Sequence, residues 1–399
     1  MPAPHPSLRS SLRAFPPAVW VLFFGTFLNK FGFFVVPFLT LYLIQRGYSL
    51  AQAGVALSCY GAGNLAASLI GGYLADRIGR RPTIVLSMFS GAAAMLLLSQ
   101  ARSLPAIDLL AVLNGLTNEL YRPAGSALLA DLVPTEHRAM AFAGLRTAFN
   151  AGYVFGPAVA GFLATRGYVW LFLGDAFTSV LYGLVALAAL PESRPKAAQP
   201  ARWADYGDVL GRDPALRRML AAVFAIGILM FQQAATFSVY LKHLGFAPTV
   251  FGMLLSLNAV IVVLCEMPLS TITRRYPVRK VLALGFVICG GAFALNGLAR
   301  TVPELVGCML LFVAGEMICI PLCASHVADL APADKRGRYM GVYSLTWSLG
   351  MVVAPQAGLS ALAAGGAALW ILSAGLGLLA ALFVMAPSER LHARNRSAP

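Results

Sequence analysis

The stretch Gly72-Tyr-Leu-Ala-Asp-Arg-Ile-Gly-Arg-Arg-Pro82 is a short charged turn between two long apolar segments. Only 12% of the chain is charged, so a cluster of four charges is a strong local signal: Asp76, Arg77, Arg80 and Arg81. Gly72 and Gly79 would let the flanking helices approach closely, since small residues allow close packing. The turn therefore predicts two membrane helices that meet at a charged loop.

Composition outside this turn predicts the fold class. The chain is 59% hydrophobic with a mean hydropathy of +0.74, whereas soluble domains are about 45–50% apolar. Apolar stretches of about 20 residues, long enough to cross a bilayer, recur along the chain. In lipid such stretches satisfy their backbone hydrogen bonds as helices. We therefore predict an all-α polytopic membrane protein with twelve transmembrane helices, at about 18–44, 52–72, 83–103, 106–128, 140–164, 168–190, 217–241, 250–272, 280–300, 303–325, 338–362 and 367–386.

The net charge of +14 reflects the topology and needs no nucleic-acid partner. Lys and Arg gather in alternate loops and in both tails, whereas the opposite loops hold five: Arg46, Arg102, Arg166, Lys242 and Arg300. The positive-inside rule then predicts cytoplasmic termini in a bacterial-type inner membrane. The apolar run after Arg13 is too long for a cleaved signal, so we expect an uncleaved first span.

An internal repeat runs through the chain at a constant offset of 198 residues, without a gap over about 115 residues. The matched pairs are Tyr42 and Tyr240, Gly47 and Gly245, Gly54 and Gly252, Pro123 and Pro321, Asp131 and Asp329, Pro134 and Pro332, Arg138 and Arg336, Gly152 and Gly350, and Pro157 and Pro355. Such a repeat indicates a duplicated unit. We expect two pseudo-symmetric six-helix bundles at 1–190 and 217–399, joined by a cytoplasmic linker at 191–216.

The twelve spans, the two halves and the charged turn together resemble the major facilitator superfamily. The turn is similar to that family's signature Gly-x-Leu-Ala-Asp-Arg-x-Gly-Arg-Lys, with Arg81 in place of the final Lys. A second pattern in the fifth span resembles the antiporter motif of the drug–proton exchangers: Gly144, Gly152, Gly156, Pro157, Ala160 and Gly161. It departs from that motif by seven rather than eight residues after Gly144, and by Ala160 where Gly is usual.

The resemblance implies that the charged turn is a conformational latch. In the family, this loop holds the cytoplasmic ends of the two halves together in the outward-facing state. Asp76 could accept charge-assisted bonds there, and Asp131 is a plausible partner for Arg77 or Arg81. The alternative is a solvated turn that only sets topology. The second half has lost the acid, which predicts a one-sided latch: Ser270, Arg274, Pro277 and Arg279 stand opposite Gly72, Asp76, Gly79 and Arg81.

Charged residues inside the spans point to the transport chemistry. A charge facing lipid costs about 2.5–3.5 kcal/mol or more, so these groups should face a cavity or one another. Glu119 and Arg122 can pair on one helix face. In the family, spans 1, 4, 7 and 10 line a central cavity. This analogy makes Lys30, Asn29, Asn118, Tyr121 and Arg122 cavity candidates, and Arg146 of the fifth span is a further charged candidate.

Two carboxylates are candidates for proton coupling. Glu316 has no obvious cation within its own span, so we expect it to carry the proton, unless it forms a structural pair with another helix. Glu119 should stay ionised beside Arg122 or Lys30 and is the second candidate. Asp175 is expected at the membrane interface near the outer end of its span.

These features favour a secondary transporter that exports small organic compounds by proton exchange. The alternative is proton-coupled uptake of a sugar, amino acid or peptide. A membrane enzyme or receptor is disfavoured, because no nucleophile–base set, phosphate-binding loop or metal-ligand cluster is present. We expect no catalytic residue, cofactor or metal, packing roles for Cys319 and Cys323, and a monomer whose partners are substrate, protons and lipid.

Overall fold

The computed structural model describes residues 15–134, 137–193, 211, 213–273, 275–332 and 336–386. Every regular element within these ranges is a helix, which confirms the all-α prediction. Ten segments of the described part are long and apolar enough to cross a membrane. The predicted spans 106–128 and 140–164 are helical but are not among the ten, so a total of twelve stays a prediction.

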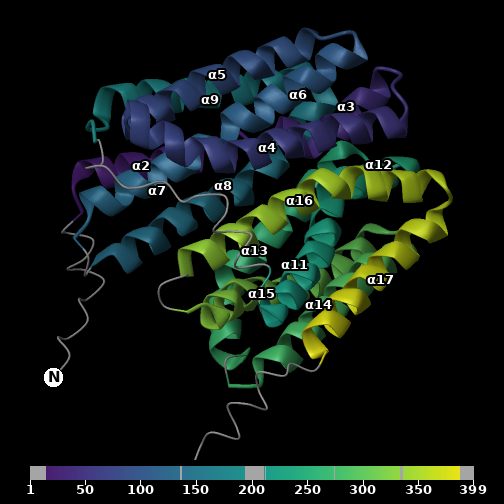
Figure 1. Cartoon of the computed structure of the whole chain (residues 1–399). Helices are drawn as coiled ribbons and strands as arrows, with labels where there is room; N and C mark the ends of the chain where they lie inside the picture. The colour runs from purple at the N-terminus through teal and green to yellow at the C-terminus, as the bar shows by residue number, and fades with distance from the viewer. Residues whose placement is uncertain are drawn as a thin grey trace, which may run out of the picture. The chain divides into compact units, whose positions relative to one another are not determined.

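The chain forms two compact units (Figure 1), one made of residues 1–200 with 234–263 and the other of 201–233 with 264–399. This grouping assigns the segment 234–263 to the first unit, although it lies within the predicted second bundle at 217–399. The linker itself, predicted at 191–216, lies mostly outside the described residues. The division into two six-helix bundles therefore stays a prediction.

The first unit is built from helices that run back and forth between short turns. Its helices are α2 (Pro17–Phe31), α3 (Val35–Gln45), α4 (Leu50–Ile78), α5 (Arg80–Gln100), α6 (Leu104–Glu119), α7 (Tyr121–Leu132), α8 (Arg138–Arg166), α9 (Val169–Ala189), α12 (Ser238–His243) and the first part of α13 (Pro248–Thr273). Helix α4 begins at a capping box in which the Ser49 hydroxyl and the Gln52 side chain satisfy each other's backbone amides. A polar side chain thus marks where this apolar helix starts.

The second unit repeats this construction. Its helices are α11 (Pro214–Gln232), the end of α13, α14 (Val278–Leu295), α15 (Val302–Leu330), α16 (Arg336–Ala363) and α17 (Gly366–Met385). The π-helix η2 (Gln233–Phe237) contributes only its first residue to this unit. Asp213 caps α11 by accepting hydrogen bonds from the amides of Ala215 and Leu216, and Pro214 occupies the first helical turn. The Tyr339 hydroxyl donates to the same carboxylate at 2.9 Å, which ties α16 to the start of α11.

Glycines bring helices α4 and α6 together backbone to backbone. A Cβ atom on Gly63 would collide with the carbonyl oxygen of Val112, and one on Gly115 would collide with that of Tyr60. Figure 1 shows the two helices side by side in the first unit. Small residues therefore position α6, the helix that carries Glu119.

Helices α6 and α7 are separated by a break at Leu120 where one continuous span was predicted. The Ser87 hydroxyl of α5 donates to the Thr117 carbonyl at 2.5 Å and accepts from the Tyr121 amide at 3.1 Å. It thus inserts between two groups that a regular helix would bond to each other. Pro123 adds to the break because it lacks an amide hydrogen.

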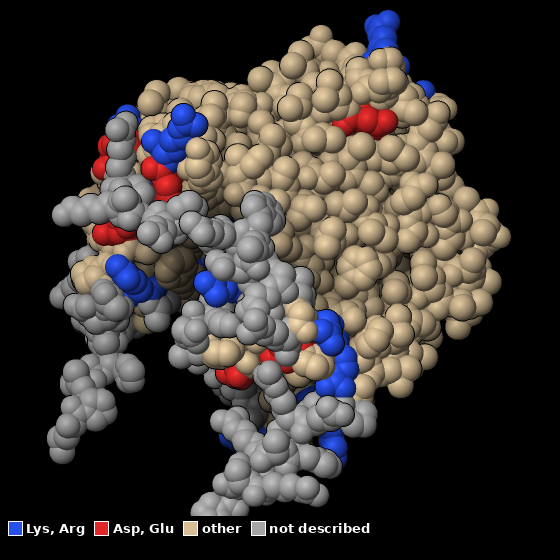
Figure 2. Space-filling model, viewed as in Figure 1, with Lys and Arg blue, Asp and Glu red and all other residues tan. Residues whose placement is uncertain are grey.

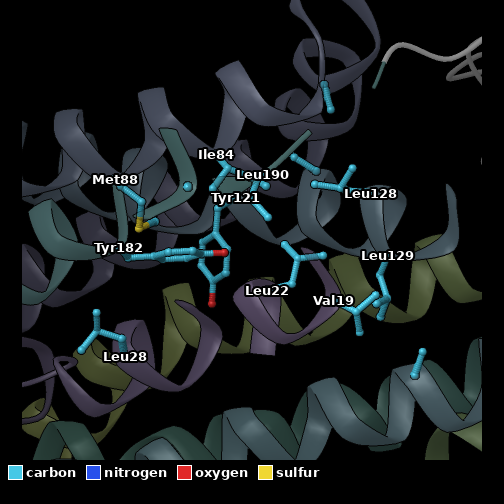
Figure 3. Packing of buried hydrophobic residues seen from close by; sticks show 14 of the residues in the cluster. Val19, Leu22, Leu28, Ile84, Met88, Tyr121, Leu128, Leu129, Tyr182 and Leu190 are labelled. Carbon is cyan, nitrogen blue, oxygen red and sulfur yellow. The ribbon is translucent and has the colours of Figure 1, made fainter. Parts of the chain in front are cut away.

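Buried apolar side chains fill the first unit below this break. Figure 3 shows Tyr121 of α7 beside Tyr182 of α9, with Met88, Ile84 and Leu22 around them. The ring centroids of the two tyrosines are 6.0 Å apart in an edge-to-face arrangement. On the outside, the face seen in Figure 2 is mostly uncharged, with Lys, Arg, Asp and Glu gathered toward its edges. A surface of this kind suits contact with lipid.

Candidate functional site

Three charged residues form a buried group in the first unit. The Lys30 ammonium lies 3.0 Å from one Glu119 carboxylate oxygen, and the Arg122 guanidinium lies 3.3 Å from the other. The side chains of Lys30 and Glu119 are 3% and 10% exposed, whereas that of Arg122 is 59% exposed. The predicted pair of Glu119 and Arg122 is therefore present, and Lys30 joins it from α2. One carboxylate here is shared by two cations.

Aromatic rings surround the Lys30 ammonium. Its nitrogen lies 5.3 Å from the ring centre of Phe33, 5.7 Å from that of Tyr121 and 5.2 Å from that of Phe149. Arg122 also lies over the Phe149 ring at 5.8 Å. Cations are attracted to the faces of such rings, especially away from water. The site therefore combines a net positive charge with flat apolar surfaces.

The polar cavity candidates differ in how far their side chains are buried. Asn29, Asn118 and Tyr121 are buried near this group. Asn118 donates to Asn114 at 3.1 Å, yet its own carbonyl oxygen and the Tyr121 hydroxyl have no hydrogen-bond partner among the described residues. Arg146 has an exposed side chain on α8.

Glu316, the predicted proton carrier, lies on α15 in the second unit and is partly exposed. Its main-chain carbonyl is 3.7 Å from the Cys319 thiol, which lies 4.0 Å from the Cys289 thiol. Within the described ranges, no three His, Cys, Asp or Glu side chains are grouped as metal ligands would be. Cys319 and Cys323 are buried in this unit.

In the charged turn, Arg80 is the residue that pairs with Asp131. Its guanidinium lies 2.5 Å from the Asp131 carboxylate, which also accepts from the Ser193 hydroxyl at 2.5 Å. The sequence suggested Arg77 or Arg81 as the partner, because periodicity alone could not show which arginine turns inward. Gly79, with φ of +102°, redirects the chain so that Arg80 is buried.

The remaining residues of the turn differ in exposure and packing, and their role as a latch stays a prediction. Asp76 and Arg77 are exposed, and within the described residues Asp76 takes part in no ion pair. A Cβ on Gly72 would meet open space, whereas one on Gly71 would lie 3.1 Å from the Leu120 carbonyl. The close approach predicted at Gly72 therefore occurs one residue earlier.

Arg81 and its repeat counterpart Arg279 make equivalent hydrogen bonds to helix ends in the two units. The Arg81 guanidinium donates to the carbonyl of Leu187 near the end of α9. Arg279 donates to the carbonyl of Val384 at 2.7 Å and to that of Ala386, at the end of α17. The last carbonyls of a helix lack helical partners, so both arginines complete a helix end.

The antiporter-type motif lies along α8 where that helix touches α2. A Cβ on Gly152 would lie 2.7 Å from the Lys30 Cβ and from the Phe31 amide nitrogen, and one on Gly156 would lie 2.6 Å from the Phe31 carbonyl oxygen. These glycines therefore let α8 press against the segment that carries Lys30.

The end of the same motif contacts α13. Gly161 packs on Pro248, and the amide of Ala158, which follows Pro157, donates to the Ser256 hydroxyl at 3.0 Å. Ser256 thereby satisfies an amide beside the proline, where the helical bonding pattern is weakened. Pro157 and Gly161 thus belong to a second helix contact.

Asp175, which the sequence placed at the membrane interface near the outer end of its span, is buried inside the first unit, and its depth in a bilayer stays a prediction. It is 5% exposed on α9, and the backbone amides of Phe34 and Val35 bond to its carboxylate. The junction of α2 and α3 packs on this part of α9, with Gly32 against Thr178 and Phe34 against Gly174. The only signal in the sequence was an acidic residue within an apolar segment.

Comparison with known proteins gives relatives over most of the chain. It is 27% identical over 352 residues to the "Uncharacterized MFS-type transporter YqjV" of Bacillus subtilis, covering 86% of this chain and 85% of that protein. It is 28% identical over 364 residues to a "Na(+), Li(+), K(+)/H(+) antiporter" of Planococcus maritimus, covering 82% and 85%. It is 27% identical over 334 residues to the "Multidrug resistance protein MdtH" of Aeromonas hydrophila, covering 83% and 84%.

Solved structures share the fold. A "POT family transporter in complex with thioalcohol conjugated peptide" superposes with a TM-score of 0.78 at 16% identity, covering 97% of this chain and 100% of that one. The profile described as "Major Facilitator Superfamily" matches residues 22–247 and 219–399, nearly the whole sequence. The relatives and the solved structures are transporters rather than enzymes. This chain is a membrane transporter that belongs to the Major Facilitator Superfamily.

Proposed function

We propose that this transporter exports small organic compounds in exchange for protons by alternating access. The observation that carries the proposal is the buried group of Lys30, Glu119 and Arg122 in its aromatic surroundings. Gain or loss of a proton by Glu119, whose side chain is 10% exposed, would change the charge of this site. A substrate that binds to the same charges then competes with the proton.

The geometry supports a substrate with an apolar body and a polar or anionic group. Lys30 is fully occupied by Glu119 and the rings, but more than half of the Arg122 side chain is exposed. Arg122 is therefore the cation of the group that can reach a substrate. Phe33 and Phe149 would pack against the apolar part of the compound.

Proton exchange as the coupling mode is supported by the relatives. One relative is named as a cation/proton antiporter and another as a multidrug resistance protein. The Gly152–Gly161 motif, which lies against α2, matches the exchanger pattern in most of its positions. We propose Glu316 as the proton carrier and Glu119 as the second coupling residue.

Proton-coupled uptake is the second candidate, and one observation favours it. Two cations around one carboxylate leave an excess positive charge, which suits a carboxylate-bearing metabolite. Such a substrate would bind Arg122 with a charge-assisted, bidentate bond. The two candidates differ in the direction of proton movement relative to substrate.

Proteoliposomes that contain a pH-sensitive dye test both candidates. Addition of a mixed set of amphipathic compounds and small metabolites should release protons in the direction opposite to substrate movement if the protein is an exchanger. Co-movement would support the uptake candidate instead, and no proton movement with any transported compound would contradict coupling.

Variants then assign the carrier. Glu316→Gln should abolish coupled proton movement, whereas Glu304→Gln should leave it intact. Glu304 is a matched control, because it lies on the same helix but only caps its exposed start, a role that Gln also fills. Undiminished coupling in Glu316→Gln would remove Glu316 from the proposal, and Glu119→Gln would then be the decisive variant.

A further inference from the structure

Asp175 has an unsatisfied oxygen in the interior of the first unit. The side chain is 5% exposed, and its Oδ2 atom has no hydrogen-bond partner among the described residues. A buried carboxylate normally satisfies its oxygens with donors or is neutralised by a proton. This oxygen is therefore a place where one proton can bind.

The same carboxylate holds the junction between α2 and α3. Helix α2 ends at Phe31, and α3 starts at Val35, so the chain is not helical between them. The amides of Val35 and Phe34 at the start of α3 face the Asp175 carboxylate and stabilise its negative charge, and the Phe34 amide also donates to the Gly32 carbonyl at 2.7 Å. A negative charge at a helix N-terminus is stabilising, and this stabilisation disappears when the charge is neutralised. The junction therefore senses the charge of Asp175.

The neighbours of Asp175 connect it to the buried ionic group. The titratable groups that interact with it are Lys30 from α2 and Tyr60 from α4. The Tyr60 hydroxyl also lacks a hydrogen-bond partner among the described residues, and it interacts electrostatically with Glu119. Lys30 itself is bound to Glu119, so it does not neutralise Asp175 alone.

We propose that Asp175 is a proton-binding site that controls the α2–α3 junction and, through it, the position of Lys30. A proton from water binds to Oδ2 and forms an O–H bond, and the carboxylate loses its charge. The amides of Phe34 and Val35 then lose their ionic acceptor, and the junction loosens. This inference rests on proton coupling as the proposed function, but it adds a group that Glu316 and Glu119 do not supply.

The second half of the repeat lacks this device. Ser373 stands where the offset of 198 places the counterpart of Asp175, and its hydroxyl donates to the Leu369 carbonyl of its own helix. The corresponding segment runs from α11 through η2 into α12 as one helical stretch. The first half thus has both the non-helical junction and the buried carboxylate. In the described residues of the second half, the equivalent positions have neither.

Infrared difference spectroscopy on the full-length protein in lipid nanodiscs tests the inference without a substrate. Between high and low pH, the wild type should show a carboxyl band that disappears in Asp175→Asn and persists in Glu119→Gln and Ser373→Ala. Asp175→Glu should retain a titrating band at a shifted position. A spectrum of Asp175→Asn identical to that of the wild type would overturn the proposal.

Hydrogen exchange measures the effect on the junction. At one neutral pH, the Phe34 and Val35 amides should exchange on the order of tenfold faster in Asp175→Asn than in the wild type, because a bond to an ionised acceptor is replaced by a weaker one. Equal rates of amide exchange in both proteins would contradict the proposed control of the α2–α3 junction by Asp175. A band lost together with unchanged thermal unfolding separates loss of the proton site from misfolding. Neither measurement needs transport, so the two results test the role of Asp175 even if the protein does not exchange protons for substrate.

Discussion

Two aromatic positions near Lys30 are aromatic in both repeats, but the charged residues beside them occur in the first repeat alone. In the first half, Phe33 and Phe149 lie over Lys30. In the second half, the offset of 198 pairs them with Phe231 and Trp347, whose rings are 6.2 Å apart in an edge-to-face arrangement. The counterparts of the three charged residues are apolar: Ile228, Met317 and Ile320. The scaffold was retained in both halves, and the ionic group is confined to one.

Packing contacts are shared where charges are not. Gly350 lies against α11 at Gly227 and Ile228, as Gly152 lies against α2 at Lys30 and Phe31. Arg279 completes the end of α17 as Arg81 completes that of α9. Duplication thus preserves the contacts that build each unit and leaves the polar interior free to differ. The comparison teaches that the first unit holds a group of paired charges for which the second has apolar residues at the equivalent positions.

A test of this comparison with a large expected effect converts the ionic group into its apolar counterpart. Glu119→Met alone leaves the Lys30 ammonium buried without the carboxylate that it bonds to, so we expect the free energy of unfolding to fall by about 3–5 kcal/mol. The triple variant Lys30→Ile, Glu119→Met and Arg122→Ile removes the whole group and should recover most of that loss. Transport should be absent in both, which thermal unfolding and proteoliposome assays would show.

A matched control is Glu304→Gln, which changes a carboxylate outside the group and should lower the free energy of unfolding much less than Glu119→Met does. If Glu119→Met were as stable as the wild type, the Lys30–Glu119 contact would have no energetic role. If the triple variant transported normally, the contrast between the two halves would have no functional meaning.

The glycine contacts that occur at equivalent positions in both halves give a test with a smaller expected effect. An alanine Cβ at Gly152 would lie 2.7 Å from the Phe31 amide nitrogen, but at Gly350 it would lie 3.2 Å from the nearest Gly227 atom. We therefore expect Gly152→Ala to cost about 1–3 kcal/mol through overpacking, and Gly350→Ala to cost less than about 1 kcal/mol. Unfolding midpoints of the two variants measure the difference. Equal losses would show that the two contacts are equally tight.

The smallest effect should come from the hydroxyl that separates α6 from α7. Ser87→Ala removes the link between Thr117 and Tyr121, at a cost of about 1 kcal/mol, and lets their backbone groups bond directly. The second half supports this reading, because Gly285 replaces Ser87 there and α15 is continuous despite Pro321. Amide exchange at Tyr121 should slow in Ser87→Ala. Ser90→Ala, which removes a hydroxyl that bonds only within α5, should change nothing.

The sequence predicted the helical fold and the repeat because both depend on composition and spacing. It also placed Glu119 and Arg122 on one helix face, since a separation of three residues forces that arrangement. It chose the wrong arginine for Asp131, and it did not reveal that Asp175 is buried among other helices. The partner of Asp131 depends on the backbone turn at Gly79, and the burial of Asp175 depends on the α2–α3 junction that folds over it. Neither is encoded in local periodicity.

By itself, the sequence determined that the chain is a polytopic helical protein with a duplicated plan, because apolar length, charge distribution and a constant offset are one-dimensional properties. Only the tertiary structure decided which charges meet. Lys30 and Glu119 are 89 residues apart in the chain and 3.0 Å apart in space. Close packing at glycines positions the helices around them, α8 against α2 at Gly152 and Gly156, and α6 against α4 at Gly63 and Gly115. A charge in a membrane protein takes its role from the partner that helix packing brings to it, and packing depends on contacts between segments that are distant in the sequence.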